Sequence, residues 1–245
     1  MSNLLVKSLI AAACAAQVTG CIYETDPGVE AAAITATWQF ENIANQQVTA
    51  CPTGFSTVAM HSFAVDAAGR PVSDDVIDLF DCFDGIGVSG PLYPDVYQTF
   101  LEVTNDSGTN VYAQTLSAIV DVVVTDKQFD ATILNDGGYF SLGWDLVGAV
   151  SNKPLSCADV GGLDGIETVS TSMATGSMAI TDQFDCEDHF GVTGGLLAGT
   201  YTVSVDAFNA DGGAIGVAPA LTSKAVLDRN RVTALETITI PINGK

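Results

Sequence analysis

The sequence predicts an all-β protein, built as two tandem Greek-key β-sandwiches with one disulfide each, behind a signal peptide and a short tether. Three observations predict this fold class. Apolar and polar residues alternate in many short runs, which is the period of half-buried strands. Landmark residues recur at nearly constant spacing in the two halves of the 245-residue chain. The cysteines beyond the N-terminal segment divide evenly between these halves.

The N-terminal segment has the pattern of a secretory signal. Lys7 is followed by an apolar stretch over residues 8–16. A bilayer-spanning helix needs roughly 20 residues, so this stretch is too short to cross a membrane and suits the hydrophobic region of a cleaved signal. Residues 18–21, Val-Thr-Gly-Cys, then resemble the bacterial lipobox. The resemblance implies that residues 1–20 are removed and that the sulfur of Cys21 receives a diacylglycerol.

The segment that starts at Cys21 is expected to be a short lipidated tether over residues 21–32. It is acidic and contains Pro27 and Gly28, which break any regular pattern. Two or more acyl chains hold a protein on a membrane stably, whereas one chain gives only marginal binding. Ile22 is not the aspartate of inner-membrane retention, so the same resemblance favours the outer membrane. The alternative is an ordinary secretory signal, with Cys21 as a spare thiol.

An internal repeat of about 105 residues follows the tether. Trp38 lies 13 residues before Cys51, and Trp144 lies 13 residues before Cys157. The tripeptide Phe-Asp-Cys and a later tyrosine recur in the same order, at residues 80–82 and 97 and again at residues 184–186 and 201. So many landmarks in register predict two copies of one structural unit.

Each repeat, over residues 33–136 and 137–245, has the pattern of short strands joined by turns. The alternation is clearest at three places, residues 34–40, 201–207 and 238–242. No convincing amphipathic helix follows residue 33. About seven short strands in roughly 100 residues predict a Greek-key sandwich. The junction at residues 135–138, Asn-Asp-Gly-Gly, is expected to be a short flexible link between the two units.

The six cysteines are accounted for by export and duplication. Cys14 leaves with the signal and Cys21 carries the lipid, so two cysteines remain in each repeat, in an oxidising compartment. Duplication selects one connectivity over the two others: Cys51–Cys82 and Cys157–Cys186. On the loop-entropy model, closing a loop of about 30 residues stabilises by roughly 3–4 kcal/mol. No thiol is then left for redox chemistry, nucleophilic catalysis or zinc.

Two further patterns resemble known bacterial surface proteins. Residues 197–205, Leu-Ala-Gly-Thr-Tyr-Thr-Val-Ser-Val, are similar to the Gly-x-Tyr strand of immunoglobulin-like and carboxypeptidase-regulatory-like sandwiches. Residues 94–97 of the first repeat keep the tyrosine but not the glycine. The wider Trp…Cys…Phe-Asp-Cys…Tyr layout resembles uncharacterised lipoproteins of the myxobacterial type. These motifs are structural, so the resemblance implies a fold and a cellular location but no activity.

The two histidines do not occupy matching positions in the repeats. His61 lies in a strand expected over residues 58–65, where a packed or solvated side chain is the favoured interpretation. His189 follows an acidic loop whose oxygens could hold a cation together with the imidazole. The carboxylates of this loop are those of Asp182, Asp185, Glu187 and Asp188. They lack the ordered spacing of a known ion loop, so we expect no metal and no other cofactor, although cation binding here stays open.

No catalytic residue is predicted. The sequence contains no Gly-x-Ser-x-Gly elbow, no His-Glu-x-x-His helix and no phosphate-cradling glycine loop. Trp38 and Trp144 could stack on sugars if they were exposed, but their matching positions on alternating strands favour the core. Eight Lys and Arg against 29 Asp and Glu give a net charge of −21. Such a surface repels phosphate backbones, so no nucleic-acid partner is expected.

The predicted function is that of a non-enzymatic lipoprotein, held by its N-terminal lipid in the outer membrane of a bacterial cell envelope. It would bind a protein or a glycan, of unknown identity, through its sandwich surfaces. The alternatives are a structural subunit or spacer of an envelope complex and, less favoured, a hydrolase with an unrecognised carboxylate site. The sequence leaves open the oligomeric state and whether the protein faces the periplasm or the cell surface.

Overall fold

A computed structural model describes residues 31–174 and 179–245 of the chain. The predicted signal peptide, the predicted lipid attachment at Cys21 and most of the predicted tether lie outside these residues. The regular secondary structure of the described residues consists of strands and three short 3₁₀ segments: η1 (Cys82–Asp84), η2 (Cys157–Asp159) and η3 (Cys186–Asp188).

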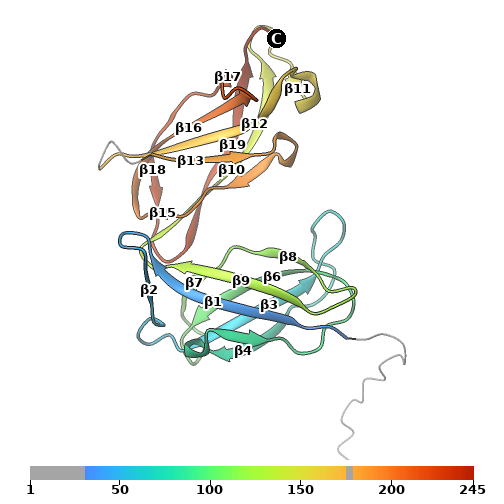
Figure 1. The fold of residues 1–245 in the computed structure, drawn as a ribbon, viewed down its shortest axis with the longest axis vertical. Coiled ribbons are helices and arrows are strands. Elements are labelled where there is room, and N and C mark those ends of the chain that lie inside the picture. The colour runs from blue at the N-terminus through green and yellow to red at the C-terminus, as the bar shows by residue number, and fades with distance from the viewer. Residues whose placement is uncertain (1–30, 175–178) are drawn as a thin grey trace, which may run out of the picture. The chain divides into compact units, whose positions relative to one another are not determined.

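The first half of the described chain forms two facing sheets. Its strands are β1 (Ile34–Asn42), β2 (Gln47–Thr49), β3 (Thr57–Ala64), β4 (Val76–Asp81), β5 (Ile86–Val88), β6 (Val96–Thr104), β7 (Val111–Gln114), β8 (Ala118–Asp121) and β9 (Lys127–Leu134). One sheet has the order β2-β1-β5 with β9 beside β1, and the other has the order β4-β3-β6-β7 with β8 beside β6. The first and last strands, β1 and β9, run parallel side by side (Figure 1).

The second half repeats this layout. Its strands are β10 (Gly137–Gly148), β11 (Pro154–Leu155), β12 (Leu163–Ser172), β13 (Ala179–Phe184), β14 (Phe190–Val192), β15 (Leu196–Leu197), β16 (Gly199–Asn209), β17 (Ala214–Val217), β18 (Leu221–Val226) and β19 (Arg231–Ile242). β10 pairs in parallel with β19, as β1 does with β9. A single pair, Gly216 with Ile242, joins the two layers of this half into one continuous sheet.

Each half has its own hydrophobic core, built from alternating strand positions. In β1 the residues Ile34, Ala36, Trp38 and Phe40 are buried, while the residues between them are less so. The two cores contain no residue in common. Disulfides join Cys51 to Cys82 and Cys157 to Cys186. The predicted fold class, two β-sandwiches with one disulfide each, is confirmed, whereas the boundary at 136/137 stays a prediction.

The two tryptophans occupy the same place in the two cores. Trp38 is 6% exposed and Trp144 is 1% exposed. The Nε1–H of Trp38 donates to the carbonyl oxygen of Cys82 at 2.9 Å, and that of Trp144 donates to the carbonyl oxygen of Cys186 at 2.9 Å. Each indole therefore packs in the core with its polar atom satisfied by a disulfide cysteine. The core interpretation of these residues is confirmed.

The prediction of a flexible link at residues 135–138 is wrong. The carboxylate of Asp136 accepts hydrogen bonds from the backbone N–H groups of Ile43 at 2.7 Å and Ala44 at 3.1 Å. Gly137 and Gly138 are buried at the start of β10. A Cβ on Gly138 would lie 2.2 Å from the carbonyl oxygen of Arg231. The glycines are here because two backbones approach closely, which needs residues without side chains.

Candidate functional site

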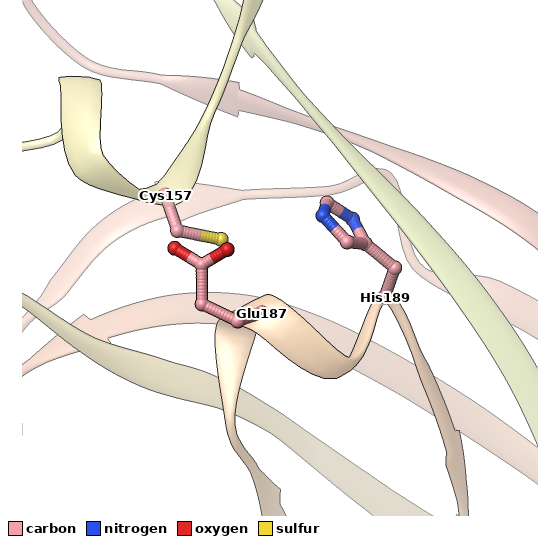
Figure 2. Close-up of side chains that lie close together, drawn as sticks. All are labelled: Cys157, Glu187 and His189. Atoms are coloured by element: carbon pink, nitrogen blue, oxygen red, sulfur yellow. The ribbon is translucent and has the colours of Figure 1, made fainter. Parts of the chain in front are cut away.

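The cation site considered at the acidic loop is not built by the described residues. Figure 2 shows the side chains of Cys157, Glu187 and His189, whose potential ligand atoms all lie within 4.8 Å of one another. The sulfur of Cys157 is bonded to that of Cys186. It is therefore not a thiolate, the form in which cysteine ligates metals. That leaves one carboxylate and one imidazole, fewer than the four ligands of a typical structural site.

The carboxylates of this loop serve the local backbone instead. Asp185 precedes η3 and accepts from the N–H of Glu187 at 3.0 Å. Asp182 accepts from the N–H of Gly194 at 2.8 Å. His189 ends η3 in the left-handed conformation, with φ 53°. Asp185 therefore has a structural role as the cap of η3, and Asp182 links β13 to the segment that precedes β15.

His61 lies in a different environment, on the outer face of the sheet β4-β3-β6. Its Nδ1 is 2.6 Å from a carboxylate oxygen of Asp75, and its Nε2 is 3.6 Å from one of Glu102. Its ring stacks on that of Phe100, with centroids 4.6 Å apart and planes 2° from parallel. The ring of Phe63 meets Phe100 edge-on at 6.4 Å. The histidine is thus one member of an aromatic cluster between two carboxylates.

This cluster belongs to a larger apolar surface. Residues opposite each other in an antiparallel pair point to the same face, and His61 is opposite Ile77 on one side and Phe100 on the other. Ile77 is 53% exposed, Leu79 in the next outward position is 68% exposed, and Ile119 on β8 is 61% exposed. We call this surface the apolar face, and its residues are His61, Phe63, Ile77, Leu79, Phe100 and Ile119.

The second sandwich has a more polar surface at the same place. The matching tyrosines of β6 and β16, Tyr97 and Tyr201, align the two sheets residue by residue. In this alignment Phe63 corresponds to Thr171, and Phe100 corresponds to Ser204. The other outward positions of β3 and β4 correspond as follows: His61 to Val169, Ile77 to Thr181, and Leu79 to Gln183. Because the second copy has the same sheet without the apolar cluster, the fold does not require the cluster.

The apolar face is bordered by carboxylates. Asp75 and Glu102 flank His61, and Asp121 lies at the end of β8. The basic residues of the first sandwich are Arg70 and Lys127. Arg70 is held by Asp66, with its Nη2 2.6 Å from a carboxylate oxygen, and this guanidinium lowers the pKa of Asp66. The surface therefore combines an apolar centre with a negative border.

The sequence pattern indicates only part of this site. For His61 it predicts a packed or solvated strand residue, and the structure places this histidine in such a strand, β3. The pattern does not distinguish Phe63 and Phe100 from core residues, because apolar residues in a strand are normally core. A comparison of outward-facing positions between the repeats would have found them. Neither histidine is hydrogen-bonded to a hydroxyl or thiol within residues 31–174 and 179–245.

A shallow polar hollow lies on the opposite sheet. It has a volume of about 370 Å³ and is lined by residues of β1 and β9, among them Thr37, Gln39, Asp130 and Thr132. The hydroxyl of Thr37 donates to Asp130 at 2.5 Å, and this hydrogen bond lowers the pKa of that carboxyl. The polar groups here are partly paired with one another, so the hollow is a weaker candidate than the apolar face.

No family model matches the chain, and no curated protein matches it. A leucine-rich repeat protein from Bacteroides thetaiotaomicron has a similar region, with a TM-score of 0.39 and 10% identity over 87% of this chain and 26% of that one. The minor pilin of Streptococcus agalactiae gives a TM-score of 0.30 with 10% identity, over 87% of this chain and 98% of that one. For the fimbrial anchor protein of Porphyromonas gingivalis these values are 0.29 and 11%, over 78% and 82%.

At these scores the likeness carries no argument about function. This chain spans only 26% of the leucine-rich repeat protein.

No helix in the described part of the chain is long and apolar enough to cross a membrane.

Proposed function

We propose that this protein is a non-enzymatic binding module of the bacterial cell envelope, which engages a partner through the apolar face of its first sandwich. One observation carries the proposal. Two copies of the same sheet occur in one chain, and the first exposes Ile77 and Leu79 where the second has Thr181 and Gln183. Exposed apolar surface is unfavourable in water, at about 25 cal/mol per Å². Clustered exposed apolar residues mark interaction sites.

The proposed location is the outer membrane, where a lipid on Cys21 would anchor the protein. It is supported by the lipobox resemblance of residues 18–21 and by the short distance in sequence from Cys21 to β1 at Ile34. Replacing Cys21 by serine is expected to abolish incorporation of labelled fatty acid and to release the protein from membranes. Continued membrane retention of the Cys21→Ser protein would contradict this part of the proposal.

Site-specific photo-crosslinking in cells tests the binding face. A photoreactive amino acid at Ile119, on the apolar face, is expected to capture a partner. The same amino acid at Gln183, which lies on the corresponding sheet of the second sandwich at the position of Leu79, is the control and is expected to capture little. Equal capture from both positions, or none from Ile119, would overturn the proposal.

The same experiment separates binding from a structural role in an envelope complex. A spacer or subunit is held in one assembly, so its crosslinks are expected to form a single product in fixed stoichiometry. An exchanging binding module is expected to give products whose yield changes with partner abundance. We favour the binding module, because the apolar face is confined to one sandwich.

A further inference from the structure

We propose that the open edge of β4 receives an extended segment of a partner protein as an additional strand, with basic residues at both ends of the paired stretch. This inference rests on the proposed function, because β4 forms one side of the apolar face. It adds the chemistry of the partner and the way in which it binds.

The edge of β4 has no neighbouring strand in the described structure. β4 is the last strand of the order β4-β3-β6-β7 and pairs only with β3. The N–H of Cys82 donates to the carbonyl of Ser56, so in the antiparallel pattern the even-numbered residues of β4 bond to β3. The backbone groups of Ile77 and Leu79 consequently point away from β3. These are the groups that an added strand would pair with.

The middle of this edge carries no charged side chain on its outward face, although Asp78 of β4 points inward, where it accepts from the N–H of Gly90 at 3.1 Å, and Asp75 and Asp81 lie at the two ends. Natural edges are blunted by charged side chains, proline or bulges, which prevent pairing with other chains. The outward residues at the middle of β4 are Ile77 and Leu79, both more than half exposed, at 53% and 68%. In the second sandwich the corresponding strand β13 is also the last of its row, yet it carries Thr181 and Gln183 at these positions. The apolar edge is therefore a property of β4 and not of the fold.

The acidic residues at the two ends of β4 indicate which side chains the partner segment would carry. The outward row along β4 reads Asp75, Ile77, Leu79, Asp81. Asp75 reaches His61 on this face, and Asp81, which is opposite Thr57, also accepts from the N–H of Phe83 at 2.9 Å as the cap of η1. A strand laid beside it presents its own alternate residues to this row. The complementary row is basic, apolar, apolar, basic. A second copy of this chain presents the same acidic row and is repelled, because like charges directly opposite are destabilising.

A synthetic peptide tests this chemistry directly. The probe has seven residues, with lysine at both ends, valine at the third and fifth positions and threonine elsewhere. It has the same pattern in both directions, so it fits a parallel or an antiparallel added strand. A second peptide with glutamate in place of lysine is the charge control. Both are added at millimolar concentration to the mature Cys21→Ser protein with its disulfides intact.

Backbone amide exchange, followed by NMR, is the measurement. With the lysine peptide the amides of Ile77 and Leu79 are expected to exchange at least tenfold more slowly, and with the glutamate peptide they are expected to be unchanged. The substitution Leu79→Lys is expected to weaken binding at least tenfold. Because Leu79 is exposed, this variant should fold normally. The matched variant Gln183→Lys on β13 is expected to bind as the unmodified protein does.

The outcomes distinguish this inference from the proposed function. If the lysine peptide does not bind, or binds without protecting these two amides, strand addition is overturned. If the peptide instead shifts the signals of Phe100 and Ile119 alone, the apolar face binds but the edge does not. Dimerisation through β4, detected by sedimentation and abolished by Leu79→Lys, would make a second copy the occupant and would also overturn the inference. Crosslinking from Ile119 tests the proposed function independently of all these results.

Discussion

Replacing Gly138 by alanine is expected to destabilise the second sandwich, although alanine is normally the better residue in a strand. The added Cβ would lie 2.2 Å from the carbonyl oxygen of Arg231 and 2.5 Å from that of Leu227. Both are backbone atoms, so no side-chain rotation relieves the overlap. Forcing extra atoms into a packed site costs about 1–3 kcal/mol. Restricting the unfolded chain offsets about 0.4–1 kcal/mol of this cost, which leaves a net loss of about 1–2 kcal/mol.

Urea unfolding of the oxidised protein measures this loss. The unfolding midpoint of the Gly138→Ala protein is expected to fall while the slope m is unchanged, because the surface exposed on unfolding is the same. Gly161→Ala is the matched control, since a Cβ there meets nothing within 4 Å. That variant is expected to be as stable as the unmodified protein or slightly more so. Equal stability of both variants would refute the close approach at Gly138 and would support the prediction of a flexible link at residues 135–138.

Three further predictions concern the second sandwich. Replacing Trp144 by phenylalanine removes the indole donor of the Cys186 carbonyl, which keeps only the hydrogen bond from the N–H of His189 at 3.3 Å. A loss of about 1 kcal/mol or more in unfolding free energy is therefore expected, measured by urea titration, and an unchanged midpoint would refute the contribution of the indole hydrogen bond. Burial and the charge of Glu167 raise the pKa of Asp206 above its ordinary value of 3.8. A carboxyl with a raised pKa contributes stability while it is protonated, and this stability is lost as the pH rises through the folded-state pKa. The substitution Asp206→Asn is therefore expected to stabilise the protein by a few tenths of a kcal/mol at pH 7 and not at pH 3. A gain in stability that is the same at both pH values would refute this reasoning. Non-reducing peptide mapping is expected to join Cys157 to Cys186, within one repeat, and any cross-repeat pairing would refute the duplication.

The strand pattern predicted the cores well, because the period of side-chain direction in a strand is two. The alternation at residues 34–40 became β1, with Trp38 buried and its neighbours less so. The same pattern could not identify the apolar face. Phe63 and Phe100 are apolar residues in strands, and sequence alone does not say whether such a residue points to the core or to the outer surface of a sheet.

The glycine pair at the junction shows a second limit. Gly137 and Gly138 resemble a flexible linker in composition, yet both are buried in β10. Glycine occurs both where the backbone needs conformational freedom and where there is no room for a side chain. Only the position of the neighbouring backbone distinguishes the two reasons, and that position is set by residues about 90 further along the chain, at Leu227 and Arg231.

The sequence by itself determined the class of the fold, its duplication and the pairing of its cysteines, because periodicity and spacing are properties of a linear chain. The tertiary structure decided which apolar residues are surface and which carboxylates are caps. It placed His61 between Asp75 and Glu102, and it left the row of Ile77 and Leu79 at an open edge. Exposure and neighbourhood depend on which strands lie side by side, and that pairing is settled by packing over the whole sandwich.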